Sequence, residues 1–461
     1  MRYVTQEKTR FWALPFLLLA AFSLAAEETA SPAGDDEPAL ETASAAHAMP
    51  DLVPPETISR LAEMVKELER ENGPYDPQLG EQLRSLGLAH RSNGDYAKAA
   101  EALSRALHIN RINTGLHSLD QLPTLEALID VYVAAENWDA LDQAYQQLLW
   151  IHRRNYDEGD EELLRVTDLV GRWKIRAYLE KLLSAPRRVT IAEAEDLYRR
   201  SIRLLEEQYG ETDPRLIDAL YGHVLANYQL LVEVANTPLS EYDRTPGFSQ
   251  PAMRLVTQCV TTPRGPVCRT IPVPNHSYLD EFRSAQQEKS MDMMKHVSAI
   301  TQALEQIVEI HEANPDLPVE SRAVALVHLG DWHMLKGREG TGIGKYQEAY
   351  RLLAAAGGRE SLIQELFGAP KTLPSLRLSV PSVDEQLEAA SAQAPYVVVA
   401  AEVSDRGRAR KIRIVEESDP GNKGALRAAR EKIKGSTFRP RLVDGEPVAT
   451  EDFRIRVTAA P

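Results

Sequence analysis

The feature that most constrains this 461-residue chain is a junction that recurs four times between residues 73 and 214. Each junction combines glycine with proline, aspartate or serine, and successive junction glycines are 42, 44 and 51 residues apart. Between the junctions, apolar residues recur at helical spacing in two blocks, which predicts a helical hairpin for each unit. A nearly regular period in this range is typical of a solenoid. The junctions are Gly73–Pro77, Gly115–Ser118, Tyr156–Gly159 and Tyr209–Pro214.

The best-defined unit covers residues 79–109. Its two helices are predicted to cross at Gly87 and Ala99, because only small side chains permit that approach. Gly94 supports the tight turn between the helices, and Leu103 and Ala106 are expected to pack on the next unit. On these positions the unit resembles the tetratricopeptide repeat, in the extended variant of kinesin light chains. The resemblance implies an array with a concave face that holds other proteins.

The later units depart from this pattern. Ile129 replaces the expected glycine of the second unit, and an insertion around Ser184 to Val189 lengthens the third. The fourth unit is interrupted after Ala235. Helical repeats are therefore predicted for residues 56–235, followed by an insertion at residues 236–276.

The first 26 residues have the composition of a secretory signal peptide. Arg2, Lys8 and Arg10 precede an apolar run, Phe11–Ala26, that ends in small residues. The run is shorter than the roughly 20 residues that a membrane-spanning helix needs, which favours cleavage over retention as an inner-membrane anchor. Residues 27–55, rich in Ala, Glu, Asp and Pro, are predicted to be a disordered linker.

The insertion predicts a β-hairpin. β-Branched residues lie on either side of Thr262–Gly265, which suits a four-residue turn. Cys259 and Cys268 are the chain's two cysteines, and in an exported protein we expect them to form a disulfide. Free thiols are the alternative.

Residues 277–357 predict a long helix followed by another hairpin, in which Gly330 repeats the small-residue crossing. A glycine cluster, Gly337–Gly344, precedes Lys345 and superficially suggests a phosphate-binding loop. That loop would need glycine at Glu339 and Ser or Thr at Tyr346. The cluster is therefore predicted to be a flexible inter-helix loop, and no cofactor is expected.

The last segment, residues 396–461, follows a predicted linker at residues 358–395. Two strand-like segments, a helical stripe at Gly421–Lys434 and two further β-branched segments occur in that order. The pattern predicts a small α+β domain of ββαββ order. The fold class is accordingly mainly α, an α-solenoid followed by this domain.

This tail resembles the C-terminal domain of the TonB family of envelope proteins over Tyr396 to Thr458. The matching pieces are the Asp405–Gly407 turn, Val415–Ser418, Phe438–Pro440 and Asp444–Val448. Gly435-Ser436-Thr437 departs from the family, which usually has an aromatic residue there. The resemblance implies a Gram-negative envelope and a domain that binds extended peptides by adding a strand to its sheet.

Charge and motif content exclude several function classes. A net charge of −15 argues against nucleic acid as a partner. The eleven histidines are scattered without a metal-ligand motif, and no nucleophile elbow occurs. The sequence therefore predicts no catalytic residue, no metal site and no enzyme.

Two surfaces remain as candidate partner sites. On the helical array, Arg84 and Arg91 are candidates for the concave face, and the favoured alternative is that both are ordinary solvated arginines. In the tail, the candidate is the sheet edge, and the alternative is an edge used only for folding or self-association. The edge residues are Phe453, Arg454, Ile455, Arg456 and Val457.

The sequence favours a non-catalytic periplasmic scaffold that binds protein or peptide partners, without a membrane span after signal cleavage. An envelope complex is a candidate setting for it. The alternative function is a TonB-type energy transducer acting on outer-membrane receptors, which would need an uncleaved N-terminal anchor. An enzyme is the third candidate. The partner's identity and the oligomeric state stay open.

Overall fold

The computed structural model describes residues 52–242, 253–274, 276–374, 383–384, 396–418 and 422–458. The predicted signal peptide, and the predicted linker up to residue 51, lie outside these ranges. The described end of that linker is held by Asn93. Its side chain accepts the N–H of Val53 at 2.8 Å and donates to the Val53 carbonyl at 2.9 Å.

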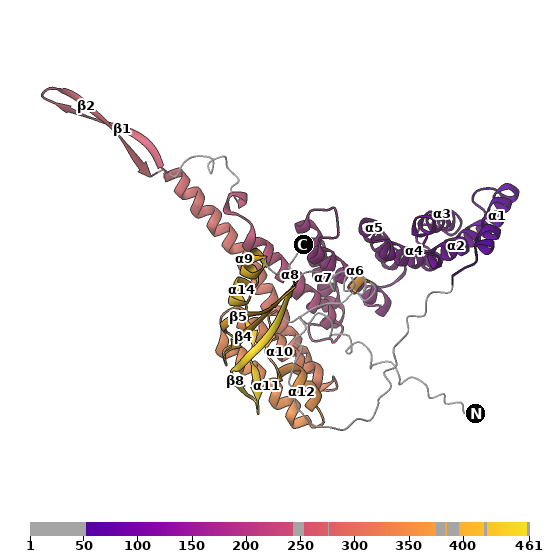
Figure 1. Ribbon diagram of the computed structural model, residues 1–461. Coiled ribbons are helices and arrows are strands. Elements are labelled where there is room, and N and C mark those ends of the chain that lie inside the picture. Colours follow the sequence, from indigo (N-terminus) through magenta and orange to yellow (C-terminus); the bar gives the residue numbers. More distant parts are fainter. Residues whose placement is uncertain are drawn as a thin grey trace.

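Helices dominate the described residues and pack in sequence as antiparallel hairpins (Figure 1). Helix α1 packs on the hairpin α2–α3, which is followed by α4–α5, α6–α7, α8–α9 and α10–α11. Short 3-10 turns, η1 (Leu119–Gln121) and η2 (Leu239–Tyr242), lie between some of them. The helix bounds are α1 Pro55–Asn72, α2 Pro77–Ser92, α3 Tyr96–Thr114, α4 Leu122–Ala134, α5 Trp138–Asn155, α6 Glu161–Glu180, α7 Arg187–Tyr209, α8 Leu216–Asn236, α9 His276–Ala313, α10 Val319–Leu335 and α11 Glu339–Ala356.

The repeated junctions are helix stop and start signals. Helices α1, α3 and α7 end at Gly73, Gly115 and Gly210, whose φ angles of 91°, 96° and 89° lie in the region that favours glycine. Each of these glycines donates its N–H to the carbonyl four residues earlier. At the start of α2, the Asp76 carboxylate accepts the N–H of Gln78 at 2.8 Å. The period in the sequence therefore records where each hairpin ends.

Glycine permits the close helix crossing in the hairpin α2–α3. A Cβ placed on Gly87 would lie 2.6 Å from Leu103 Cγ and 3.3 Å from the Ala99 carbonyl oxygen. The predicted crossing of Gly87 with Ala99 is confirmed. Any larger side chain at position 87 would push the two helices apart.

The same contact recurs between α10 and α11 and corrects one prediction. A Cβ on Gly342 would lie 2.8 Å from the Gly330 carbonyl oxygen, so the predicted crossing at Gly330 is confirmed. The predicted flexible loop at Gly337–Gly344 is wrong, because α11 begins at Glu339 and contains most of the cluster. Close packing on α10 offsets the low helix propensity of glycine.

Helix α3 is covered on both sides, which corrects a second prediction. Leu103 packs with Leu125 of the next unit, as expected. Ala106 instead packs with Val65 of α1 and Leu79 of α2. Because α1 supplies an additional helix before the first hairpin, Ala102 and Ala106 of α3 face backwards toward it.

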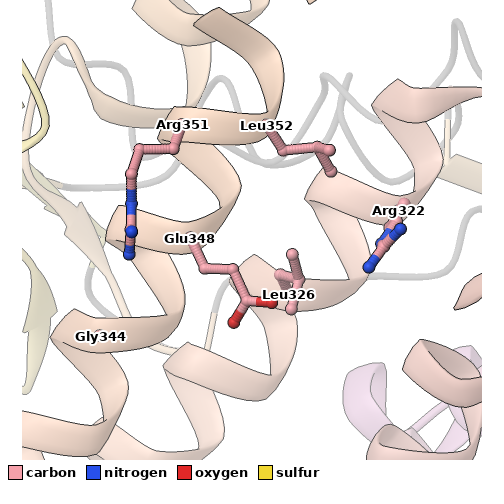
Figure 2. A pocket seen from close by; sticks show the side chains of 6 residues that line it. All are labelled: Arg322, Leu326, Gly344, Glu348, Arg351 and Leu352. Atoms are coloured by element: carbon pink, nitrogen blue, oxygen red, sulfur yellow. The ribbon is translucent and has the colours of Figure 1, made fainter. Parts of the chain in front are cut away.

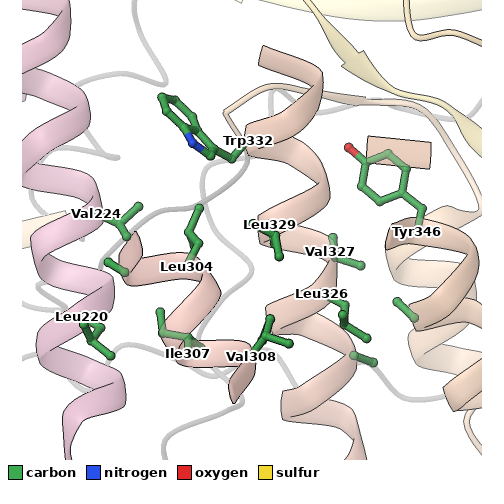
Figure 3. Packing of buried hydrophobic residues seen from close by; sticks show 14 of the residues in the cluster. Leu220, Val224, Leu304, Ile307, Val308, Leu326, Val327, Leu329, Trp332 and Tyr346 are labelled. Carbon is green, nitrogen blue, oxygen red and sulfur yellow. The ribbon is translucent and has the colours of Figure 1, made fainter. Parts of the chain in front are cut away.

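The array continues across the insertion. Helix α9 packs along α8, and their apolar side chains join those of α10 and α11 in one core (Figure 3). The insertion therefore lies within the connection of the hairpin α8–α9. Figure 3 labels Leu220 and Val224 from α8, Leu304, Ile307 and Val308 from α9, Leu326, Val327, Leu329 and Trp332 from α10, and Tyr346 from α11.

The insertion forms the predicted hairpin, with longer strands than expected. Strand β1 (Met253–Thr262) pairs antiparallel with β2 (Gly265–Pro274). Figure 1 shows this hairpin extending away from the helical array beyond the end of α9.

The predicted linker at residues 358–395 contains structure. Helix α12 (Glu360–Phe367) buries Phe367, and strand β3 (Lys371–Thr372) pairs with β6 (Phe438–Arg439) of the C-terminal domain. The linker prediction is wrong for these residues, because apolar side chains in α12 reach the core of α10 and α11.

The C-terminal domain has a three-stranded main sheet in the order β5-β4-β9 within the described residues. Helix α14 covers one face, where Ala429 and Ile433 pack on valines of β4. The predicted ββαββ order is wrong for the first strand after the helix. That strand, β6, pairs with β3 and lies outside the main sheet. The bounds are β4 Tyr396–Val403, β5 Ala409–Glu417, α14 Lys423–Gly435, β7 Arg441–Val443, β8 Glu446–Val448 and β9 Thr450–Thr458.

Candidate binding surfaces

The predicted arginines of the helical face both engage carboxylates. Arg84 of α2 donates to Glu81 at 2.8 Å within the same helix. Arg91 donates to Asp130 of α4 at 2.7 Å. The structure therefore places both residues on α2 but gives them different partners.

The Arg91–Asp130 pair joins the first helices of two successive hairpins. Farther along, Arg165 of α6 bonds Glu162 at 2.6 Å. The first helices thus present alternating charges that neutralise one another locally. A partner with its own charged groups could exchange with these exposed pairs at small cost, because such pairs contribute little to stability. Sequence reasoning missed Asp130, whose signal is its position on the first helix of the adjacent unit.

The predicted C-terminal edge residues lie on β9, at one edge of the main sheet. Ile455 and Val457 are buried, and Phe453 packs edge-on to Phe438 with ring centroids 6.3 Å apart. Arg454 pairs with Asp452 at 3.3 Å, and the Arg456 guanidinium lies 3.9 Å from the Tyr396 ring centroid. The apolar members therefore stabilise the domain, and the surface available to a partner is the strand's backbone.

The hydrogen bonds of Tyr396 establish which way that backbone points. The Tyr396 carbonyl accepts from the Ser418 N–H, and its own N–H donates to the Ser418 hydroxyl, so both groups face the β5 side. Tyr396 is opposite Thr458 on β9, and Val398 is opposite Arg456. Because inward and outward groups alternate along an antiparallel pair, the Arg456 N–H points away from β4.

A buried ion pair fixes the C-terminal domain to the helical array. The Arg439 guanidinium donates to both carboxylate oxygens of Asp331 in α10, at 2.7 and 3.0 Å, and to the Leu366 carbonyl at 3.1 Å. The Tyr346 hydroxyl donates to the same carboxylate at 2.7 Å. Only 2% of the Arg439 side chain and 6% of Asp331 are exposed.

The buried ion pair stabilises the fold only while Arg439, Asp331 and Tyr346 are all present. Burial raises the pKa of Tyr346 well above its usual value, and the nearby Asp331 carboxylate acts in the same direction. Burial opposes the charge of Arg439, but the Asp331 carboxylate outweighs it and the pKa of Arg439 is raised. Two charges and a hydroxyl that satisfy one another in this way are stable together, whereas removal of one leaves a buried charge. The sequence contained Arg439 in a matched motif, but nothing in it indicated Asp331.

A surface pocket of about 470 Å³ lies between α10 and α11 (Figure 2). Its lining combines the aliphatic side chains of Leu326 and Leu352 with the charged groups of Arg322, Glu348 and Arg351. Arg322 also bonds Glu312 at 3.1 Å. Sequence reasoning did not single out these residues.

The two cysteines lie where the sequence predicted. Cys259 of β1 is opposite Cys268 of β2, and a disulfide joins them. The bond crosses the middle of the hairpin, whose residues with described burial are exposed or half-buried. A cross-link in this position limits the unfolded states of the hairpin.

The described part of the chain contains neither a metal-ligand cluster nor a membrane-length apolar helix. Its His, Cys, Asp and Glu side chains form no group of three or more that could hold a metal ion. None of its helices combines the length and apolar character needed to span a membrane.

No protein-family model matches this chain, and no curated protein matches it. Among solved structures, a protein from Podosopora anserina, described as a kinesin light chain with nearly identical TPR-like repeats, is 16% identical. The match covers 38% of this chain and 77% of that one, with a TM-score of 0.29. BtubC (BKLC) from P. vanneervenii is 14% identical, over 66% of this chain and 91% of that one, with a TM-score of 0.32. Likenesses this distant carry no weight for fold or function, and the helical array rests on its own contacts.

Proposed function

We propose that the chain is a non-catalytic scaffold of the periplasm that holds protein or peptide partners. Its helical array is of the tetratricopeptide type, and its C-terminal domain is of the TonB type. The array acts as a platform, and the C-terminal sheet supplies an edge for strand addition. The periplasmic location rests on the N-terminal sequence and on the TonB resemblance.

One observation carries this proposal: β9 lies at the edge of the sheet, and its Arg456 N–H points away from β4. An extended peptide that joins a sheet edge gains main-chain hydrogen bonds irrespective of most of its side chains. Buried Ile455 and Val457 keep the strand in register. The edge is therefore fixed in shape before a partner arrives, which lowers the entropic cost of binding.

The anchor at Arg439 supports the same function. A sheet held by a buried ion pair on α10 keeps a constant position relative to the helical face. A partner that contacts both the β9 edge and the helical array then meets them at one fixed separation. Two linked contacts raise affinity beyond that of either one.

Selection of peptides, followed by binding measurements on backbone variants, tests whether partners bind at the β9 edge. A phage-displayed peptide library would be selected on the oxidised full-length chain, and the binding of individual peptides measured by fluorescence anisotropy. Arg456→Pro removes one outward N–H, which an edge strand tolerates, and should weaken binding at least tenfold. Arg456→Ala keeps the N–H and should bind as the wild type does. Equal loss in both variants, or none in Arg456→Pro, would contradict strand addition at β9.

The energy-transducer alternative differs at the N-terminus. The mass of the mature chain purified from the bacterial envelope separates the two functions. A start near Ala26 supports the scaffold, because a transducer requires an uncleaved anchor. A mass that includes the first 25 residues would support the transducer instead.

A further inference from the structure

The hairpin β1–β2 has two outer edges of different chemistry. Three of the ten residues of β2 are prolines: Pro266, Pro272 and Pro274. They occupy even positions, opposite Thr261, Leu255 and Met253 in turn. A proline has no N–H, so its position decides which edge loses donors.

The register shows that the prolines affect the outer edge of β2. Thr262 and Gly265 flank the two-residue connection and form the hydrogen-bonded pair that closes such a turn. The pairs then alternate, which makes Cys259–Cys268 a non-hydrogen-bonded pair. Its Cα–Cα distance of 3.9 Å fits that closer type. Residues of non-hydrogen-bonded pairs direct their backbone groups outward, so all three prolines remove outward donors.

The outer edge of β1 retains its donors. In β1 the outward positions are the odd ones, and none is proline: Met253, Leu255, Thr257, Cys259 and Thr261. Within the described residues, β2 is the one strand that pairs with β1. Natural proteins block exposed edges with proline or charge to prevent pairing. Here one edge is blocked and the other is open.

The hairpin also exposes apolar side chains. Leu255 is 74% exposed, Val260 66% and Val267 59%. A two-stranded sheet with both faces in water is marginally stable, and three or more strands are normally needed. The disulfide and a 2.9 Å hydroxyl contact between Thr257 and Thr270 hold the two strands together. The hairpin is therefore preorganised for further strands on the β1 side.

We propose that β1 pairs antiparallel with β1 of a second copy of this chain. The product is a four-stranded sheet in the order β2-β1-β1-β2. Both of its outer edges are then β2 strands that carry prolines, so the sheet closes at two copies and does not propagate. Such a two-fold contact uses the same surface on both subunits.

The pairing is centred on Thr257, which lies opposite Thr257 of the second copy. Leu255 then lies opposite Cys259, and Arg254 opposite Val260. The two Arg254 side chains are about 20 Å apart at ~3.4 Å per residue, beyond the Debye length of roughly 8 Å at physiological salt. Arg264 and Arg269 lie on the turn and on β2, away from the new contact.

The charge of the hairpin suggests a binding partner other than a second copy of the chain. The described hairpin contains three arginines and no carboxylate, in a chain of net charge −15. An acidic surface could attract it. Attraction of that kind does not require one open and one blocked edge, so the prolines favour the second copy.

Sedimentation velocity of the oxidised full-length chain from 1 to 100 µM tests the proposal. We expect a reversible monomer–dimer equilibrium. Leu255→Pro removes one outward N–H of β1 and should raise the dimer Kd at least tenfold. Leu255→Ala removes the side chain but keeps that N–H, and should stay within about threefold of wild type. Thr270→Pro places the same substitution on the blocked edge and should leave dimerisation intact.

A distance measurement checks the geometry independently of the variants' folding. A spin label at Arg264→Cys marks the tip of each hairpin, and antiparallel pairing about Thr257 puts the two tips about 45 Å apart. A monomer at 100 µM, a dimer insensitive to Leu255→Pro, or tips at a clearly different separation would overturn the proposal. So would a wild-type monomer that binds vesicles containing phosphatidylglycerol, which would assign the hairpin to an anionic surface.

Discussion

Two β-structured regions branch from the same helical array, and they are held in opposite ways. The C-terminal domain is docked through a buried ion pair, Arg439–Asp331, between the domain and α10. The hairpin β1–β2 extends away from the array, and each of its side chains with described burial is exposed or half-buried. The hairpin is held together by its disulfide and lacks an apolar core among its described residues.

The two kinds of attachment suit different tasks: the ion pair fixes the position of the C-terminal domain, and the disulfide leaves the direction of the hairpin free. A buried charge pair fixes one geometry, because any displacement leaves charges without partners in an apolar setting. A disulfide constrains the hairpin internally but does not determine where it points. The docked sheet is suited to presenting an edge at a constant place, and the hairpin is suited to contacts at a distance from the body.

Removal of one member of the docking pair should give the largest effect. Asp331→Ala leaves the Arg439 charge buried, and we expect a loss of about 3–5 kcal/mol in the free energy of unfolding. Urea denaturation followed by circular dichroism measures it. The double variant Asp331→Leu with Arg439→Met should recover most of the loss, because neither charge remains.

Glu67→Ala is the matched control for the docking pair. It breaks an ion pair with Arg70 that is exposed on α1, where such pairs contribute little. If Asp331→Ala destabilised the chain no more than this control, the docking pair would not have the role assigned to it.

Acidification should destabilise the helical body and spare the hairpin. Burial lowers the pKa values of His223 and His328 to about 4. The unfolded histidines take up protons near pH 6.5 and the folded ones near 4, so stability is lost as pH falls through that window. Asp168 acts oppositely, because burial raises its pKa to about 6. Burial also lowers the pKa values of His296, His311 and His333, which act in the same direction as His223 and His328, so the net effect is a loss on the order of a few kcal/mol.

Urea denaturation at pH 7 and pH 4.5 measures this loss, and His328→Gln should reduce it. The hairpin's ionisable side chains outside its disulfide are arginines, so its stability should not change over the same range. Unchanged stability of the body at pH 4.5 would contradict the role given to the two histidines.

Loss of the disulfide should be smaller and local. Cys259→Ser with Cys268→Ser removes the constraint on a short loop, worth about 2–3 kcal/mol for the hairpin. Hydrogen exchange of the β1 and β2 amides should accelerate, while the amides of α10 and the main sheet stay protected. Acceleration across the main sheet would show that the two regions are not independent.

The smallest effect is expected on the helical face. Arg91→Ala breaks its exposed pair with Asp130, and we expect a stability change below about 1 kcal/mol. A calorimetric scan checks it. A larger loss would mean that the pair joins the two hairpins structurally and is not available to a partner.

The sequence predicted most of the repeats because their signals are local. Junction glycines, helical apolar spacing and the small residue at Gly87 each act within one hairpin. It missed α12 and the Arg439–Asp331 pair, because a contact across 108 residues has no local pattern. It also misassigned the glycines of α11, since their tolerance in a helix depends on α10.

The candidate binding surfaces also combine features with a local sequence signal and features that depend on distant residues. The strand that carries Phe453 to Val457 was predictable from its alternation, and so was the cysteine pair. The outward direction of the Arg456 N–H depends on the register with β4, which no periodicity determines. The partner of Arg91 likewise lies in another repeat.

The most direct test of this account is a distance distribution between the helical array and the docked sheet. Spin labels at Arg351→Cys on α11 and Arg410→Cys on β5, in the oxidised chain, would be measured by pulsed dipolar spectroscopy. We predict one narrow distance in the wild-type background and a broad distribution after Asp331→Ala. A broad distribution in the wild-type background would contradict the account, because the C-terminal sheet would then not be held in place.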